Sequence, residues 1–355
     1  MSRAGGHTGF MATAPALRAW ADTALRAVGL SIEDAELVAG HLVQTSLWGI
    51  DTHGIARLPH YLQRLSIGSI EAKPRIRVHQ TGAATASLDG GHGLGMVVCS
   101  RAMDEASRLA REAGVGMVGC YNSSHCGAIG LYGRQAARAG LIGIAFTHAS
   151  AVVVPHQGRR SFLGTNPLCI TVPCAHAEPV CLDMATTWIP FNRVMNARRD
   201  GEGLPPDVAV DADGQATTDA QAATALLPLA GHKGYAMAFM IDILCGLLNG
   251  APYGPHIPPM YEGLDARRRL GSLMVAVDPS RFAGGPMLAD QVLAMAREAR
   301  AQPAAAPGAE VLVPGDPEYR CAQRREAEGI PVEPGLAEQL QAWSQRLRVA
   351  GPDLS

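Results

Sequence analysis

The sequence predicts an α/β protein in which short buried strands alternate with amphipathic helices. Two helix–glycine–strand units indicate this class. In the first, Val97–Ala113 is amphipathic, Gly114 stands at the helix C-terminus, and residues 115–120 are apolar. In the second, a helix up to residue 139 ends at Gly140, and residues 141–147 are again apolar. The 355 residues, 47% of them hydrophobic, are enough for two domains with a sizeable core.

Residues 15–48 are expected to form two helices. Apolar residues recur at helical spacing before Gly29, which ends the first helix. Ser31 then precedes the second helix, and Asp34 follows three residues later, which is the spacing of a capping box. A last amphipathic helix is expected over residues 336–349, close to the end of the sequence.

The remaining segments fit the same class. Strands are expected at residues 168–172, 180–184 and 273–277, and a short one at 311–313. The apolar stretch 235–248 is predicted to be a buried helix. Residues 200–222 contain few large apolar side chains and are expected to form a long loop, with further Pro, Gly and Ala connectors at 251–260 and 302–309.

Composition and charge exclude several classes of partner. The net charge of −2 gives no electrostatic footprint for nucleic acid or an anionic membrane, and Arg267-Arg268-Arg269 is interpreted as a solvated surface stretch. The apolar stretch around Asp242 is too short to span a bilayer. Met1–Gly9 lacks the apolar stretch of a signal peptide, and the eight scattered cysteines are typical of reduced thiols, so we expect a cytoplasmic protein.

Several common chemical motifs are absent. No G-x-G-x-x-G follows a predicted strand, so the Rossmann fingerprint is missing, and there is no Walker motif, H-E-x-x-H or G-x-S-x-G. The fragment Asp211-Ala-Asp-Gly214 lacks the later ligands of a calcium loop and is interpreted as a turn. We therefore expect no metal site.

His125 is the first candidate for chemistry. It lies in Asn122-Ser-Ser-His-Cys-Gly127, directly after a predicted buried strand, where catalytic groups are often held by a rigid sheet. An imidazole suits proton exchange with a developing alkoxide or amine because its pKa is ordinarily close to neutral pH. The structural alternative is a histidine that caps the next helix.

The segment Asp51-Thr-His-Gly-Ile-Ala-Arg57 is the second candidate. Thr52 and His53 place a hydroxyl beside an imidazole, and Gly54 would allow a ligand to approach closely. Arg57 follows His53 by four residues, so both would point the same way on a helix, and a guanidinium suits a carboxylate. The structural alternative is a polar helix end with surface charges.

Polar turns and one lysine complete the candidates. Gly164-Thr-Asn-Pro167 and Asp183-Met-Ala-Thr-Thr187 lie beside predicted strands and could offer backbone N–H groups to phosphate or ribose oxygens. Lys233, in Gly231-His-Lys-Gly-Tyr235, stands on the first turn of a helix, where a lysine is poorly matched to the helix dipole. That placement suits a pyrophosphate or ribose contact, although a solvated lysine is the alternative.

Taken in order, these motifs resemble the malate/L-lactate dehydrogenase family of NAD(P)-dependent oxidoreductases that lack a Rossmann fold. The resemblance begins at Gly49–Arg57 with Tyr61 and ends near Gly329-Ile-Pro331, so it covers almost the whole chain. Between these ends the matching segments are Asn122–His125, Leu163–Pro167, Leu182–Thr187, Leu227–Pro228 with Gly231–Tyr235, and Val313–Asp316.

The resemblance implies a fold and a set of roles. It implies a non-Rossmann mixed-sheet NAD(P)-binding and catalytic domain over 86–319, an N-terminal helical domain of 1–85 joined by 320–355, and a homodimer. His125 would exchange the proton, Thr52 and His53 would belong to the active site, and Arg57 would hold the substrate carboxylate. The implied cofactor-binding residues are Thr165, Asn166, Asp183, Met184, Ala185, Lys233, Pro314, Gly315 and Asp316.

Two departures from the family pattern bear on the substrate. Thr52 stands where serine is usual, which keeps the hydroxyl and adds a methyl group. Arg193, in Ile189-Pro-Phe-Asn-Arg-Val194, stands where imine-reducing relatives tend to carry an acid, which favours a further contact to an anionic substrate. The expected reaction is hydride transfer between NAD or NADP and a small 2-oxo or 2-hydroxy carboxylate. The alternatives are reduction of a cyclic or N-alkyl imine, such as Δ1-piperideine-2-carboxylate, and an inactive cofactor-binding homologue.

Overall fold

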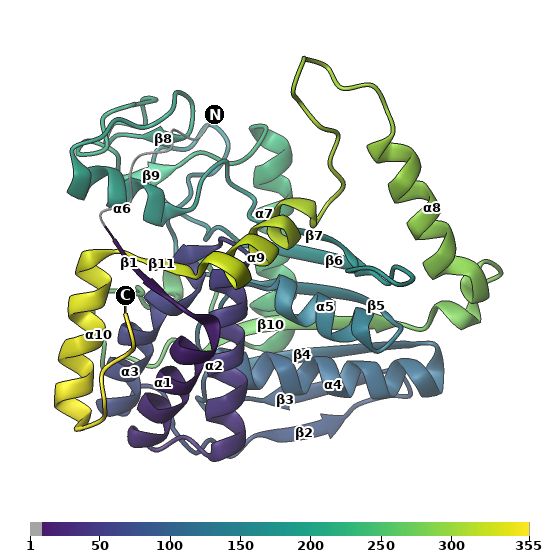
Figure 1. Cartoon of the computed structure of the whole chain (residues 1–355), viewed down its shortest axis with the longest axis horizontal. Coiled ribbons are helices and arrows are strands. Elements are labelled where there is room, and N and C mark those ends of the chain that lie inside the picture. The colour runs from purple at the N-terminus through teal and green to yellow at the C-terminus, as the bar shows by residue number, and fades with distance from the viewer. Residues whose placement is uncertain (1–8, 355) are drawn as a thin grey trace. The chain divides into compact units, whose positions relative to one another are not determined.

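A computed structural model describes residues 9–354 of the chain, which forms two compact units (Figure 1). Unit 1 combines the chain up to Lys73 with the chain from Leu312 onward, and unit 2 spans Pro74–Val311. Most of Met1–Gly9, the segment judged not to be a signal peptide, lies outside the described residues. Whether the two units match independently folding domains with the expected boundaries stays a prediction.

Unit 1 is mainly helical. Ser31 caps its second helix by accepting a hydrogen bond from the Asp34 amide at 3.2 Å, as the capping-box spacing predicted. The two short strands pair antiparallel, with Met11 opposite Pro331, so the N-terminal and C-terminal segments belong to one unit. The elements of unit 1 are β1 (Phe10–Ala12), α1 (Ala14–Ala27), α2 (Ile32–Leu47), η1 (Asp51–His53), η2 (Ile55–Arg57), α3 (Leu58–Ser66), α9 (Asp316–Glu328), β11 (Ile330–Val332) and α10 (Pro334–Leu347).

Unit 2 is built on a mixed seven-stranded sheet of order β2-β3-β4-β10-β5-β6-β7, in which β3 and β4 run parallel and the other neighbours run antiparallel. Its strands are β2 (Arg77–Gln80), β3 (Thr85–Asp89), β4 (Val115–Ser123), β5 (Ile142–Thr147), β6 (Leu168–Val172), β7 (Val180–Met184) and β10 (Leu270–Val277). The other elements are α4 (Gly95–Ala113), α5 (Gly130–Arg138), α6 (Phe191–Asp200), β8 (Ala209–Val210), β9 (Ala225–Leu226), α7 (His232–Cys245), η3 (Leu247–Asn249), η4 (Gly254–His256), η5 (Pro279–Arg281), η6 (Gly285–Met287) and α8 (Leu288–Arg300).

Glycines show which helices cover which face of the sheet. A Cβ on Gly116 of β4 would meet the backbone of α4, whereas one on Gly119 would meet Asn249 of η3. Because side chains alternate along a strand, these two positions face opposite sides. Helices α4 and α5 therefore lie on one face, over the main buried cluster, and α7 packs on β10 and β5 (Figure 1). A second cluster surrounds α6, β8 and β9.

Three predictions were wrong. Residues 311–313 form no strand. Helix α7 is not buried on all sides, because Met237, Phe239 and Met240 are exposed. Arg268 is only 4% exposed: its Nε donates to the Pro258 carbonyl and its Nη2 to Ser150 Oγ. A guanidinium that donates to the loops around it can lie inside the protein, so the three arginines are not all solvated.

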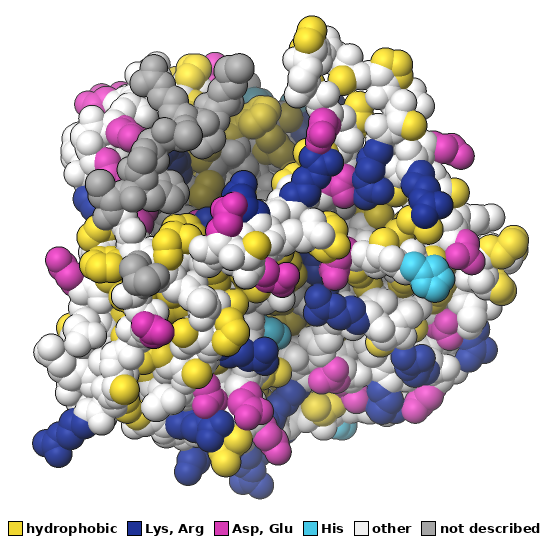
Figure 2. Space-filling view, viewed as in Figure 1, with side chains coloured by type: hydrophobic (Ala, Val, Ile, Leu, Met, Phe, Trp, Pro, Cys, Tyr) yellow, Lys and Arg dark blue, Asp and Glu magenta, His cyan; other side chains and the backbone are white. Residues whose placement is uncertain are grey.

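The described residues also bear on charge, thiols and membranes. All eight cysteines are free thiols, as expected. Across the described residues, no helix is both long and apolar enough to cross a membrane. On the face shown in Figure 2, basic and acidic side chains are interspersed, with no large area of one sign.

Candidate active site

His125 lies just beyond the C-terminal end of β4, in the loop that leads to α5. The amide of Gly127 donates a hydrogen bond to His125 Nδ1 at 3.2 Å, and Gly127 takes a left-handed backbone conformation with φ 71° to close this turn. The neighbouring Ser124 hydroxyl accepts from the Gly95 amide at 2.9 Å, which anchors the loop to the first turn of α4. The loop thus fixes the orientation of the imidazole through Nδ1.

Thr52, His53 and Arg57 lie within two consecutive 3-10 turns of unit 1, η1 and η2. Thr52 Oγ1 lies 2.9 Å from His53 Nδ1, so the hydroxyl and the imidazole form a hydrogen-bonded pair. Arg57 is buried, and its Nε donates to the Thr52 carbonyl at 2.5 Å. The structure therefore brings together the three residues that the sequence singled out in this segment.

The surroundings of His53 lower the pKa of its imidazole. Burial lowers the pKa of His53 to about 4, and the positive charge of Arg57 acts in the same direction. The imidazole is therefore neutral at pH 7. A neutral ring can relay or accept a hydrogen bond from the Thr52 hydroxyl, and it leaves Arg57 as the cationic group beside it.

Two contacts fix this segment within unit 1. A Cβ on Gly54 would lie 2.1 Å from Ser46 Oγ, so the close approach that the glycine allows is to α2 and not to a ligand. The amide of Ile55 donates to the same hydroxyl at 2.9 Å. Arg325 of α9 forms a two-pronged ion pair with Asp51, with N–O distances of 2.5 and 2.9 Å. Helices α2 and α9 thus hold the segment from Asp51 to Ile55 in place.

The predicted cofactor-binding turns of unit 2 lie next to one another. Strands β6 and β7 pair so that Asp183 faces Cys169, which places the turn after β7 beside the Gly164–Pro167 turn. Thr186 joins them, because its amide and hydroxyl both donate to the Thr165 carbonyl, at 3.0 and 2.8 Å. The Thr186 carbonyl in turn accepts from the Leu229 amide, just before α7.

The side chains in these turns differ in what they can reach. Asn166 is fully buried; its Oδ1 accepts from the Ala149 amide at 3.1 Å and its Nδ2 donates to the Ala238 carbonyl at 2.9 Å. Asp183 Oδ2 accepts from the Gly130 amide at the start of α5, at 2.8 Å. Met184 and Ala185, at the end of β7 and just after it, are partly exposed.

Two of the predicted site residues of unit 2, Lys233 and Arg193, are basic and exposed. Lys233 lies in the first turn of α7, which has no side-chain cap, and its ammonium group forms no hydrogen bond or ion pair with the described residues. Arg193 of α6 pairs with Glu202 at 3.2 Å, and both side chains are about half exposed. Lys233 is therefore available to an anion, whereas Arg193 would have to exchange Glu202 for a substrate group.

Pro314, Gly315 and Asp316 form the entry to α9 in unit 1. Gly315 has φ 100°, a conformation that favours glycine, and it is the N-cap of the helix. Asp316 Oδ2 accepts from the Val313 amide at 3.0 Å and carries a negative charge in the first turn. This turn offers backbone N–H groups at a helix N-terminus.

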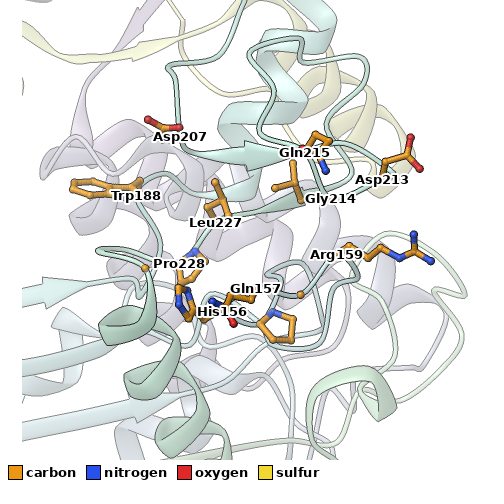
Figure 3. A pocket seen from close by; sticks show the side chains of 14 residues that line it. His156, Gln157, Arg159, Trp188, Asp207, Asp213, Gly214, Gln215, Leu227 and Pro228 are labelled. Atoms are coloured by element: carbon orange, nitrogen blue, oxygen red, sulfur yellow. The ribbon is translucent and has the colours of Figure 1, made fainter.

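A cavity of about 560 Å³ lies in unit 2. Figure 3 shows its wall, formed by the loop from Pro155 to Arg159, the β8 turn around Gly214, Trp188 and the segment from Leu227 to Gly231. The residues predicted to contact substrate or cofactor do not line it, although Gly231 belongs to the predicted Gly231–Tyr235 segment and Trp188 directly follows the Asp183–Thr187 segment. We therefore place the candidate chemistry on the residues above and not in this cavity.

Comparison with known proteins identifies the class. The model of the malate/L-lactate dehydrogenase family matches residues 12–341. The chain is 36% identical over 327 residues to L-sulfolactate dehydrogenase from Methanothermobacter thermautotrophicus, covering 92% of this chain and 94% of that protein. It is 37% identical over 304 residues to ureidoglycolate dehydrogenase (NAD(+)) from Escherichia coli O157:H7, covering 86% and 87%. The name of another relative specifies NADP(+).

Solved structures of dehydrogenases and of a reductase share the fold of this chain. Malate dehydrogenase from Entamoeba histolytica superimposes with a TM-score of 0.91 at 28% identity, covering 97% of this chain and 99% of that one. Δ1-Piperideine-2-carboxylate reductase from Pseudomonas syringae superimposes with a TM-score of 0.82, also at 28% identity, covering 95% and 98%. Fold and matches define an NAD(P)-dependent oxidoreductase without a Rossmann fold. The chain belongs to the malate/L-lactate dehydrogenase family, as the sequence predicted.

Proposed function

We propose that this enzyme transfers a hydride between NAD(P) and C2 of a small 2-oxo or 2-hydroxy carboxylate, with His125 as the proton-exchanging group. The observation that carries the proposal is the orientation of the His125 ring, whose Nδ1 is engaged by the Gly127 amide. Nε2 is then the atom that exchanges a proton with the substrate oxygen. A positioned histidine suits this step because its ordinary pKa lies close to working pH.

Several of the predicted residues suit a dinucleotide cofactor. The unpaired ammonium of Lys233 at an uncapped helix start suits the negative charge of a dinucleotide diphosphate. Met184 and Ala185, which are partly exposed, and the Pro314–Asp316 turn are the other residues that we propose for cofactor binding. We propose that Thr165, Asn166 and Asp183 support binding by fixing these turns, because the Asn166 side chain is buried and Asp183 bonds to the start of α5. When bound, the nicotinamide donates or accepts the hydride.

The substrate carboxylate is assigned to Arg57. The bond from its Nε to the Thr52 carbonyl fixes the guanidinium, and a guanidinium suits a carboxylate because it can donate two parallel hydrogen bonds. Thr52 and His53 would orient the substrate through their hydrogen-bonded pair. Arg193 would add a contact to a second anionic group by releasing Glu202.

The second candidate function is reduction of a cyclic imine, such as Δ1-piperideine-2-carboxylate. The similarity to the Pseudomonas syringae reductase supports it. Arg193 argues against it, because a cation beside the substrate favours a dianion over a protonated imine. An inactive homologue that only binds a cofactor is the third candidate.

Absorbance at 340 nm separates these candidates. NADH and NADPH are each paired with pyruvate, oxaloacetate, 2-oxoglutarate, a branched 2-oxo acid and Δ1-piperideine-2-carboxylate, and the oxo acids are tested with and without methylamine. Oxidation with an oxo acid alone is expected. Activity only with the imine, or only with the amine, would favour the reductase, and no oxidation with any pair would contradict both.

The role of His125 has its own test. His125→Asn is expected to lower kcat by roughly 10²–10⁴-fold, the contribution of a general acid or base. His79→Asn, a change at an exposed histidine of β2, is the matched control and should keep full activity. A kcat of His125→Asn near the wild-type value would contradict the assignment.

We further propose a cytoplasmic homodimer. Free thiols support the compartment. Exposed Met237 and Met240 of α7 continue into Leu247 and Leu248 of η3, an apolar strip of the kind that copies of a chain bury against each other. Light scattering is expected to give twice the chain mass, and Met240→Asp should shift the equilibrium toward monomer. A wild-type protein that is monomeric at micromolar concentration would contradict the proposal.

A further inference from the structure

A buried hydrogen-bonded pair joins α7 to the sheet of unit 2. His148 follows β5 directly, and its Nδ1 lies 2.9 Å from Asp242 Oδ1 on α7. The His148 side chain is fully buried and that of Asp242 is 5% exposed. In the sequence, Asp242 only argued against a membrane span, and nothing marked His148 as a candidate functional residue.

The backbone fixes which ring nitrogen of His148 carries the proton. The amide of Gly271, in β10, donates to His148 Nε2 at 2.9 Å. An Nε2 that accepts a hydrogen bond carries no proton, so the proton of the neutral ring lies on Nδ1 and is donated to Asp242. The pair therefore connects three elements, β5, α7 and β10, through two directional hydrogen bonds.

The burial of Asp242 is costly. Its Oδ2 is buried and has no hydrogen-bond partner among the described residues. An isolated carboxylate oxygen in this position destabilises the fold, and an apolar residue of similar size would pack there without that cost. A group held at such a cost suggests a purpose other than stability.

The contacts of α7 with its surroundings differ in how strongly they fix the position of the helix. The buried residues of α7 are mostly small, namely Gly234, Ala238, Ile241, Asp242 and Cys245. Small apolar contacts are not directional and set the helix register weakly. Directional contacts are the Asp242 bond to His148 and the bond from Asn166 Nδ2 to the Ala238 carbonyl. A third, from Asn249 Nδ2 to the Leu244 and Cys245 carbonyls, lies at the C-terminal end of the helix, and its donor belongs to the adjoining η3.

We propose that His148 and Asp242 are positioning residues that hold α7 in the register that presents Lys233 to the cofactor, an inference that rests on the proposed function of Lys233. Lys233 lies nine residues before Asp242 on the same helix, about 13 Å along its axis. A helix moves as a rigid body over this length, so a slip or rotation at Asp242 displaces the ammonium group by a similar amount.

A double substitution separates positioning from stability. In His148→Leu/Asp242→Leu both polar side chains are replaced by apolar ones, so no unpaired charge is left buried. The Gly271 amide loses its acceptor, so the melting temperature should fall by about a few degrees while the protein stays folded. The Kd for NADH or NADPH, measured by fluorescence, is expected to rise about 10-fold, the size of coupling seen between groups in one network. A folded double variant with wild-type Kd would overturn the proposal.

His148→Gln is the conservative variant. One carboxamide offers a donor to Asp242 and an acceptor to the Gly271 amide, as the neutral imidazole does. Cofactor affinity should therefore be kept. Ser272→Ala is the matched control, because it removes a buried hydrogen bond of 2.9 Å to Thr147 between β10 and β5 without touching α7. If Ser272→Ala weakened cofactor binding as much as the double variant, any loss of packing would explain the effect and the proposal would fail.

A double-mutant cycle distinguishes this proposal from the function on which it rests. If the pair acts through Lys233, the double leucine change should weaken cofactor binding in the wild-type background and have little further effect in Lys233→Ala. A Lys233→Ala variant that binds cofactor normally would contradict the role of Lys233 itself. A Lys233→Ala variant with weak binding, combined with full additivity of the two changes, would contradict only the positioning role.

Discussion

The neutral state of His53 has a consequence for stability that can be measured. The pKa of this imidazole is 6.5 in a model compound and about 4 in the folded protein, because burial and then Arg57 disfavour its charged form. Between these values the unfolded chain binds a proton that the folded chain does not. The stabilisation is therefore complete above pH 6.5 and is lost as the pH falls toward 4.

The size of the effect follows from the pKa. Each pH unit within that window lowers the free energy of unfolding by about 1.4 kcal/mol, so the full loss is about 3 kcal/mol and the loss between pH 7.5 and 5.0 is about 2 kcal/mol. Replacing the ring by a side chain that does not titrate removes this dependence. Between pH 7.5 and 5.0 the free energy of unfolding should therefore fall by about 2 kcal/mol less in His53→Gln than in wild type.

Urea unfolding followed by tryptophan fluorescence at the two pH values measures this difference. Other groups also titrate over this range, so the comparison is between proteins and not between pH values. His79→Gln, at an exposed position of β2, is the matched control and should follow wild type. Equal pH dependence in wild type and His53→Gln would refute the reasoning, because His53 would then bind protons equally in the folded and unfolded states.

Further predictions concern packing and substrate binding. Gly54→Ala places a Cβ 2.1 Å from Ser46 Oγ and should cost about 1–3 kcal/mol of unfolding free energy, whereas Gly335→Ala in α10, where nothing lies within 4 Å, should not destabilise; equal denaturation midpoints would contradict this. Arg57→Met should raise KM for every carboxylate substrate at least about 10-fold, the loss of a charge-assisted contact. Arg193→Ala should raise KM for dicarboxylates only; unchanged steady-state kinetics across the panel would end its assignment.

The sequence predicted the main elements of unit 2 well because their signals are local. Helix α4 ends at Gly114, with φ 88°, and the apolar runs after both glycines are strands, since a helix stop followed by a buried run depends on a few neighbouring residues. The segments at 168–172 and 180–184 match β6 and β7 to the residue. The family could be predicted too, because it rests on the order of motifs along the chain.

Predictions that depended on burial were less successful. An apolar stretch such as α7 gives no hint that Met240 is exposed, because nothing in the sequence states which side meets the sheet. The same limit explains Arg268, which lies between two exposed arginines and yet is buried. The strand expected at 311–313 has no neighbour to pair with in the part of the chain that the structure describes.

The sequence by itself determined the α/β class, the family and the identity of the chemical groups, because residue type and local order carry that information. Only the tertiary structure decided what each group contacts. Gly54 packs on Ser46, Asn166 is turned inward, and Asp242 meets His148 across 94 positions of the chain. Such pairings depend on how distant segments are brought together by burial of apolar surface, and no local pattern encodes a partner so far away in the chain.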